Sequence, residues 1–280
     1  MLAAYTFFGG WVVMEKTETD RHWLADYHHL AASRGLKPCA LLKSDPLPDI
    51  HPDSRLFSLA RLLESPELIW RVIRDNYPDA DHPRIQKARV SVLQQNLALQ
   101  IIWPLVLQLF RDGNSIALNP SKVFLGWKDK DLSWLHLNDT PEPLETKAFI
   151  HRLSEQLQNW YPIFRQQLGV SPGAYWSSVG LALGAPYSMI WNQVNPDALC
   201  KQANHWLAQF NCEANKHIDW IPAEFSQHMC AIPQRRGCCL KYMLPEEGYC
   251  GTCGVHRKER MAQIETRQSI PQAPKNAQSW

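Results

Sequence analysis

Along most of the chain, hydrophobic positions recur every three or four residues, the spacing typical of amphipathic helices. A short N-terminal helix is predicted first, then a proline-rich loop at residues 36–51, and then a helix over Leu56–Leu63, where four leucines share one face. A longer helix is predicted from about Pro83 to Phe110. It should be kinked near Pro104, because proline cannot donate the helical hydrogen bond.

Between Ser115 and Leu137 the hydrophobic period changes from helical to alternating. Val123, Leu125 and Trp127 fall on one face of this stretch, and a polar turn follows them. Such alternation, broken by a turn, predicts a small antiparallel sheet. Helical spacing returns at residues 153–168, after Ser171-Pro172 and after Asn195-Pro196. The predicted fold class is therefore α+β, with a predominantly helical body and a small antiparallel sheet at about residues 115–137.

The helical pattern stops at Asp219, and the chain to about Arg260 is dense in cysteine, proline, glycine and arginine. This composition is typical of a small unit that is organised by bound metal rather than by a hydrophobic core. The predicted organisation is an N-terminal helix and loop at 1–50, the helical body at 51–218, a C-terminal cysteine-rich segment at 219–262 and a disordered tail at 263–280.

The low net charge and the short length of the main apolar run exclude several classes of function. The formal net charge is only +2, so no strong basic field attracts nucleic acid. The apolar run at residues 97–110 is too short to span a bilayer, so we expect no integral membrane segment.

The first thirteen residues are uncharged and mostly apolar, but no basic residue precedes them and no small-residue cleavage pattern follows. We therefore do not expect a secretion signal, and Met14 is an alternative start. The protein is expected in the cytoplasm, either free or peripherally at the inner membrane, where cysteines stay reduced.

Four cysteines crowd into sixteen residues near the C-terminus: Cys238, Cys239, Cys250 and Cys253. Thiolates select iron–sulfur clusters, zinc or cuprous copper, and four of them can complete the coordination of a cluster. Zinc sites usually take two separated C-x-x-C pairs, whereas here one pair is adjacent. Side chains of adjacent residues diverge in extended backbone, which suits a larger cluster better than one ion. Zinc and redox-active dithiols remain as alternatives.

Other residues of this segment have simpler interpretations. Arg235 and Arg236 add positive charge that favours thiolate, although by themselves they are typical of a solvated face. Cys200, Cys212 and Cys230 are irregularly spaced and are expected to be small hydrophobic residues rather than ligands.

The segment RRGCCLKYMLPEEGYCGTCGVHR resembles the C-terminal signature of the FhuF-type siderophore ferric reductases, in which two adjacent cysteines are followed by ten residues and then C-x-x-C. All four positions match, at Cys238, Cys239, Cys250 and Cys253. The resemblance implies that these four cysteines hold a 2Fe-2S cluster, so that residues 219–262 form an iron–sulfur binding segment. It also implies a helix-rich cytoplasmic reductase of hydroxamate-type ferric siderophores.

A protein of this kind would be an oxidoreductase that releases siderophore iron by one-electron transfer, and it would need no catalytic acid, base or nucleophile. No G-x-G-x-x-G or Walker loop is visible in the sequence, so the electrons should come from an external donor such as a ferredoxin, a flavodoxin or a flavin reductase. Two alternatives are a zinc-stabilised binding module without redox activity and a siderophore-synthetase-like enzyme. The latter is disfavoured because no nucleotide-binding motif is visible.

Overall fold

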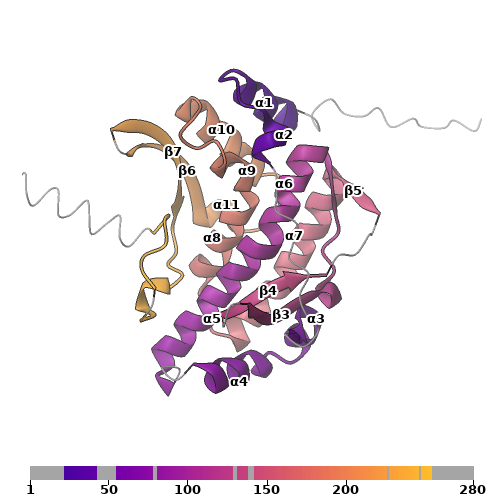
Figure 1. Ribbon diagram of the computed structural model, residues 1–280, viewed down its shortest axis with the longest axis vertical. Coiled ribbons are helices and arrows are strands. Elements are labelled where there is room, and N and C mark those ends of the chain that lie inside the picture. The colour runs from indigo at the N-terminus through magenta and orange to yellow at the C-terminus, as the bar shows by residue number, and fades with distance from the viewer. Residues whose placement is uncertain are drawn as a thin grey trace, which may run out of the picture.

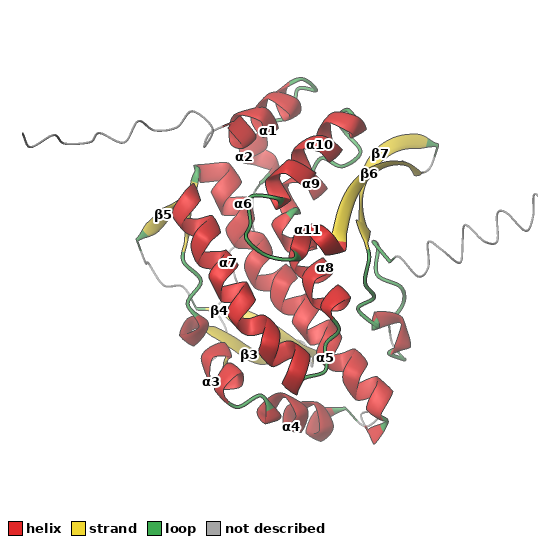
Figure 2. Ribbon diagram, turned by 180° about the vertical axis from the view of Figure 1, so that it is seen from behind, coloured by secondary structure: helices red, strands yellow, loops and turns green. Residues whose placement is uncertain are grey.

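The computed structural model describes residues 22–42, 55–77, 81–128, 131–137, 142–225, 227–245 and 247–253. The questions about the first thirteen residues and about the tail at 263–280 lie outside this part of the chain. Within it, helices form the body and three small antiparallel sheets lie at its periphery, which confirms the α+β prediction (Figures 1 and 2). The predicted domain boundaries stay predictions.

The described helices and strands follow one another without internal repetition. The helices are α1 His22–Ala32, α2 Pro38–Leu41, α3 Leu59–Glu64, α4 Glu67–Asn76, α5 Pro83–Leu97, α6 Trp103–Asp112, α7 Thr146–Pro162, α8 Pro172–Leu183, α9 Ala185–Ser188, α10 Pro196–Leu207 and α11 Ala214–His217. The strands are β1 Arg55–Ser58, β2 Asn114–Ile116, β3 Val123–Lys128, β4 Asp131–His136, β5 Pro143–Glu145, β6 Ile218–Phe225 and β7 His228–Arg235.

The sheet predicted at about residues 115–137 is confirmed. Strands β3 and β4 pair antiparallel, with Val123 opposite His136 at one end, and β1 pairs with the free edge of β3. The helix predicted over Leu56–Leu63 is therefore partly wrong, because Leu56 lies in β1. The helix α3 begins only after Ser58, whose hydroxyl accepts a hydrogen bond from the Arg61 amide as a helix cap.

The central helix is interrupted just before Pro104, close to the predicted kink. Residues Ala98–Ile102 form a π-helical turn between α5 and α6, and the Trp103 amide donates to the carbonyl of Ala98. This wider turn accommodates a proline that lacks the amide proton of a regular helix. By length and composition, Pro83–Asp112 could cross a membrane, but 72% of its most apolar window is buried inside the fold. It is the core helix of the body.

The hairpin of β6 and β7 was not anticipated by the sequence analysis. Its two strands pair over their full length, from Ile218 opposite Arg235 to Phe225 opposite His228. Only the base of β6 alternates between buried and exposed positions, whereas the tip is largely exposed, so a period of two is hard to detect in the sequence. The side-chain amide of Asn204, on α10, donates a 3.0 Å hydrogen bond to the Trp220 carbonyl and accepts another 3.0 Å hydrogen bond from the Trp220 backbone N–H. These bonds attach the base of the hairpin to the body.

Candidate metal centre

The four C-terminal cysteines follow β7 and lie together in the structure. The Sγ atoms of Cys239 and Cys250 are 3.8 Å apart, and Cys238 interacts electrostatically with both Cys239 and Cys253. The Cys253 amide donates to the Cys250 carbonyl at 2.9 Å, which closes the C-x-x-C turn. The fold therefore brings together four thiols from two chain segments that are ten residues apart.

The ten residues between the two cysteine pairs fold back on themselves. Lys241 Nζ lies 2.8 Å from a carboxylate oxygen of Glu247, and the rings of Tyr242 and Tyr249 stack with their centroids 5.3 Å apart. An exposed ion pair is worth only a fraction of a kcal/mol, and the stacked rings contribute a similar amount. Together these contacts hold the two halves of the loop side by side, so that Cys250 lies next to Cys239.

The thiols span the boundary between the body and the solvent. Cys239 and Cys253 are 2% and 9% exposed, whereas Cys238 and Cys250 are only partly buried. A group held by all four would have one side against the protein and one edge near the surface. This placement suits an exchange of electrons with partners that do not enter the core.

The contact between Cys239 and Cys250 shifts the pKa values of the two thiols in opposite directions. The hydrogen bond with Cys250 lowers the pKa of Cys239 to about 6, and the same contact raises the pKa of Cys250. Arg235 also lowers the pKa of Cys239. Burial raises the pKa of Cys238, although the Leu240 amide donates to its sulfur at 3.3 Å. Thiolate at Cys239 is the form that binds metal.

Arg235, the last residue of β7, is 3% exposed and faces this group of thiols. Its Nε donates to the Ser177 hydroxyl and one terminal nitrogen donates to the Ser178 hydroxyl, both at 2.9 Å. The other terminal nitrogen is 3.8 Å from Cys250 Sγ. No carboxylate among the described residues forms an ion pair with Arg235.

A buried cation without a counter-charge costs several kcal/mol, so the structure favours negative charge at the sulfurs. The donor set therefore fits an anionic, thiolate-held group. The sequence interpretation of a solvated arginine face is correct for Arg236, which is exposed and pairs with Asp219. It is wrong for Arg235, because the alternation of β7 turns that side chain toward α8.

The first turn of α8 forms the floor beneath the cysteine segment, through a contact between two glycines. A Cβ on Gly237 would lie 2.1 Å from the carbonyl carbon of Gly173, much closer than any real contact. Neither glycine has a positive φ, so the requirement is for space and not for backbone conformation. The same helix also carries the two serines that hold Arg235.

We expect Gly237→Ala to destabilise the docking of the cysteine segment by about 2–3 kcal/mol, because backbone must move on both sides of the added methyl group. Gly248→Ala is the matched control, since a Cβ there meets nothing within 4 Å. The measurement is the midpoint of chemical denaturation, together with the metal content after purification. Equal midpoints for the two variants would contradict the close contact.

Three other cysteines, Cys200, Cys212 and Cys230, lie outside the group of four clustered thiols. Cys200 and Cys230 are buried and Cys212 is half-buried, and all three are free thiols. Burial raises the pKa of Cys200 and of Cys212 to about 11, which disfavours the thiolate form that metals require. Within the described ranges, no three His, Cys, Asp or Glu side chains are gathered tightly enough to hold a single metal ion.

A comparison with known protein families gives a match that falls on this site. Residues 235–253 match the family model described as the FhuF 2Fe-2S C-terminal domain, and this range contains the four clustered cysteines. It also begins at the buried arginine. No curated protein matches the chain. The resemblance found in the sequence is thus confirmed for the C-terminal segment, and the cofactor indicated is a 2Fe-2S cluster.

Proposed function

Since the chain carries an FhuF-type 2Fe-2S C-terminal domain, we propose that it reduces ferric iron bound to siderophores, those of the hydroxamate type first, and releases ferrous iron in the cytoplasm. The proposed cluster ligands are Cys238, Cys239, Cys250 and Cys253. The observation that supports this most strongly is the convergence of these four thiols beside a buried arginine that has no carboxylate partner among the residues the structure describes. A cytoplasmic reductase of this kind would belong to siderophore iron acquisition.

The proposed reaction is the transfer of one electron to the bound ferric iron. A siderophore surrounds Fe³⁺ with hard oxygen donors and holds the softer, less charged Fe²⁺ far less tightly, so one added electron releases the metal. When bound, a 2Fe-2S cluster supplies single electrons without a change of ligands. The chain's own residues hold the cluster, offset its negative charge through Arg235 and keep one edge of the site near solvent.

The electron donor is proposed to be a separate protein, such as a ferredoxin, a flavodoxin or a flavin reductase. We expect purified holoprotein with NADPH alone to reduce a ferric hydroxamate at a rate close to the protein-free blank, because the sequence shows no nucleotide-binding motif. Addition of a ferredoxin and its reductase should restore turnover. A full rate with NADPH alone, followed as formation of a ferrous chelate complex, would contradict the need for a donor.

A single-turnover experiment tests the proposed reaction without any donor protein. Holoprotein is reduced, freed of reductant and mixed anaerobically with a ferric hydroxamate in the presence of a ferrous trap. One ferrous ion should be trapped for each chain oxidised, and the visible spectrum of the oxidised protein should return with the same time course. The gallium(III) complex of the same siderophore is the control, because Ga³⁺ accepts no electron. Reoxidation without trapped ferrous iron would overturn the proposal.

A further inference from the structure

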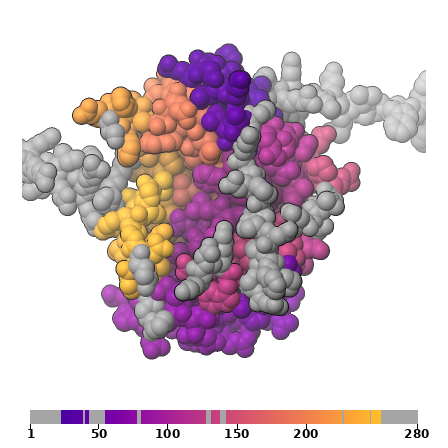
Figure 3. Space-filling model, viewed as in Figure 1, coloured from indigo at the N-terminus to yellow at the C-terminus, as the bar shows by residue number. Residues whose placement is uncertain are grey.

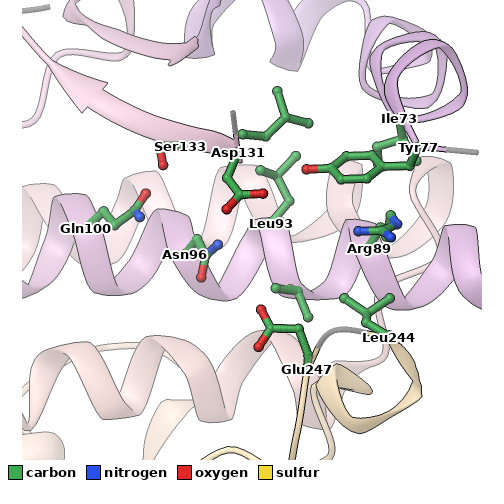
Figure 4. A pocket seen from close by; sticks show the side chains of 12 residues that line it. Ile73, Tyr77, Arg89, Leu93, Asn96, Gln100, Asp131, Ser133, Leu244 and Glu247 are labelled. Carbon is green, nitrogen blue, oxygen red and sulfur yellow. The ribbon is translucent and has the colours of Figure 1, made fainter. Parts of the chain in front are cut away.

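A cavity of about 610 Å³ lies between the body and the cysteine segment. Its lining comes from four places that are distant in sequence: the end of α4, the helix α5 with the π-helical turn that follows it, the start of β4, and the loop between the two cysteine pairs (Figure 4). Figure 3 shows the cysteine segment, in yellow, against the magenta and purple of the body. Sites for small molecules typically measure about 300–1,000 Å³, so this cavity has the size of a ligand site.

The cavity lies close to the proposed cluster ligands. Leu244 and Glu247 belong to its wall, and Glu247 precedes Cys250 by only three residues. Three residues of fully extended chain span at most about 11 Å, which limits the separation between this wall and the sulfur-bearing backbone. A ligand in the cavity therefore lies beside the segment from which an electron would leave.

The walls are polar and the floor is apolar. Asp131 from β4 and Glu247 from the loop between the cysteine pairs supply two carboxylates, and Asn96 of α5 and Gln100 of the following π-helical turn supply amides. Leu93, which is buried, lies between them at the base. The mixture of an apolar floor with a few converging polar groups is typical of a site for a small organic ligand.

Two contacts hold these walls in place. The side-chain oxygen of Gln100 accepts a 2.8 Å hydrogen bond from the backbone amide of Trp134, which fixes the π-helical turn after α5 to β4. At the other end, the guanidinium of Arg89 lies 3.7 Å from the centre of the Tyr77 ring. Among the described lining residues, most belong to elements of the body, and Leu244 and Glu247 belong to the cysteine segment.

The named charges favour one kind of ligand. Among the described residues, Asp131 and Arg89 carry opposite charges and Glu247 is already paired with Lys241 Nζ at 2.8 Å, so the described charges nearly balance at neutral pH. The described residues offer no surplus positive charge to replace the hydration of a strongly anionic chelate, whereas a neutral or cationic chelate needs none. Amide-bearing chelates could also exchange hydrogen bonds with Asn96 and Gln100.

We propose that this cavity, bounded by α5, β4, Leu244 and Glu247, is the binding site for the ferric chelate, and that it admits chelates without net negative charge. The inference rests on the proposed function, because it names where that substrate binds. It adds a role for residues of the body, which lie outside the matched segment at 235–253.

The test measures binding separately from electron transfer. The probe is the gallium(III) complex of desferrioxamine B, which is cationic and cannot be reduced, titrated into oxidised holoprotein by calorimetry. We expect Asn96→Trp to weaken binding by about ten-fold or more, because the indole fills the cavity. Asp131→Asn should weaken it by about three-fold and reduce its salt dependence. Asn215→Trp, on the exposed surface of α11, is the matched control and should bind as the unmodified protein does.

Each variant is accepted only if its visible spectrum and its electron paramagnetic resonance signal equal those of the unmodified protein, which separates loss of the site from loss of the fold. Unchanged affinity in both Asn96→Trp and Asp131→Asn, with normal chelate reduction, would overturn the cavity assignment and leave the proposed function intact.

If the unmodified protein neither binds the gallium complex nor reduces the ferric one, the proposed function itself fails. A trianionic gallium tricatecholate that binds as tightly as the cationic complex would overturn the charge preference.

Discussion

Serine in place of Cys239 or Cys253 is expected to remove nearly all iron and acid-labile sulfide from the purified protein. These are the two buried thiols of the set, and an alcohol is a far poorer donor than thiolate for iron in a cluster. With three thiolates left, one iron of a 2Fe-2S cluster lacks a ligand and the cluster is lost or degraded. The measurement is iron and sulfide per chain after anaerobic purification.

Cys212→Ser is the matched control for these variants. Cys212 is also a free thiol and its pKa is raised by burial to about 11, but it lies in another part of the fold, beside α11. It should retain the iron and sulfide content of the unmodified protein. A Cys253→Ser protein with full metal content, or a Cys212→Ser protein without any, would refute the proposed ligand set.

Arg235→Gln is expected to make the midpoint reduction potential more negative, on the order of 60 mV, which is about ten-fold in the one-electron equilibrium. Reduction adds a negative charge, and the guanidinium favours that charge from a buried position 3.8 Å from Cys250 Sγ. Arg236→Gln is the control, because that neighbouring side chain is exposed and pairs with Asp219. Its potential should shift far less, since exposed charges are screened by solvent.

Arg235→Lys separates the charge from the geometry. Lysine keeps the positive charge but cannot bridge Ser177 and Ser178 as the planar guanidinium does. We therefore expect a potential nearer to that of the unmodified protein and a lower denaturation midpoint. Redox titration followed by electron paramagnetic resonance gives the potentials, and a shift in Arg236→Gln as large as in Arg235→Gln would contradict a special role for Arg235.

The helical body and the β3–β4 sheet were predictable because each has a clear hydrophobic period. The sequence misplaced Leu56, because two leucines of β1 and α3 fall by chance at helical spacing across a strand-to-helix junction. It also missed the β6–β7 hairpin, because Pro222 and Pro233, of a residue type uncommon within strands, lie inside the paired strands and the tip buries few side chains. Such a hairpin is specified by its contacts with α8 and α10 more than by its own pattern.

For the site, the cysteine pattern alone indicated a metal centre, since the spacing of thiols is a local property. The burial of Arg235 could not be read from the sequence, because it depends on the register of β7 against Ser177 and Ser178 of α8, almost sixty residues earlier. The cavity between α5, β4, Leu244 and Glu247 could not be predicted for the same reason, because its lining comes from segments distant in sequence. The pairing of Gly173 with Gly237 is likewise visible only in the fold.

Anaerobic purification followed by reduction and electron paramagnetic resonance tests the central claim most directly. Unmodified protein should be red-brown, contain two irons and two sulfides per chain as a 2Fe-2S centre requires, and give the signal of a reduced cluster. A colourless protein that contains zinc, lacks labile sulfide and stays silent after reduction would contradict the account, and would leave the cysteine segment as a structural module.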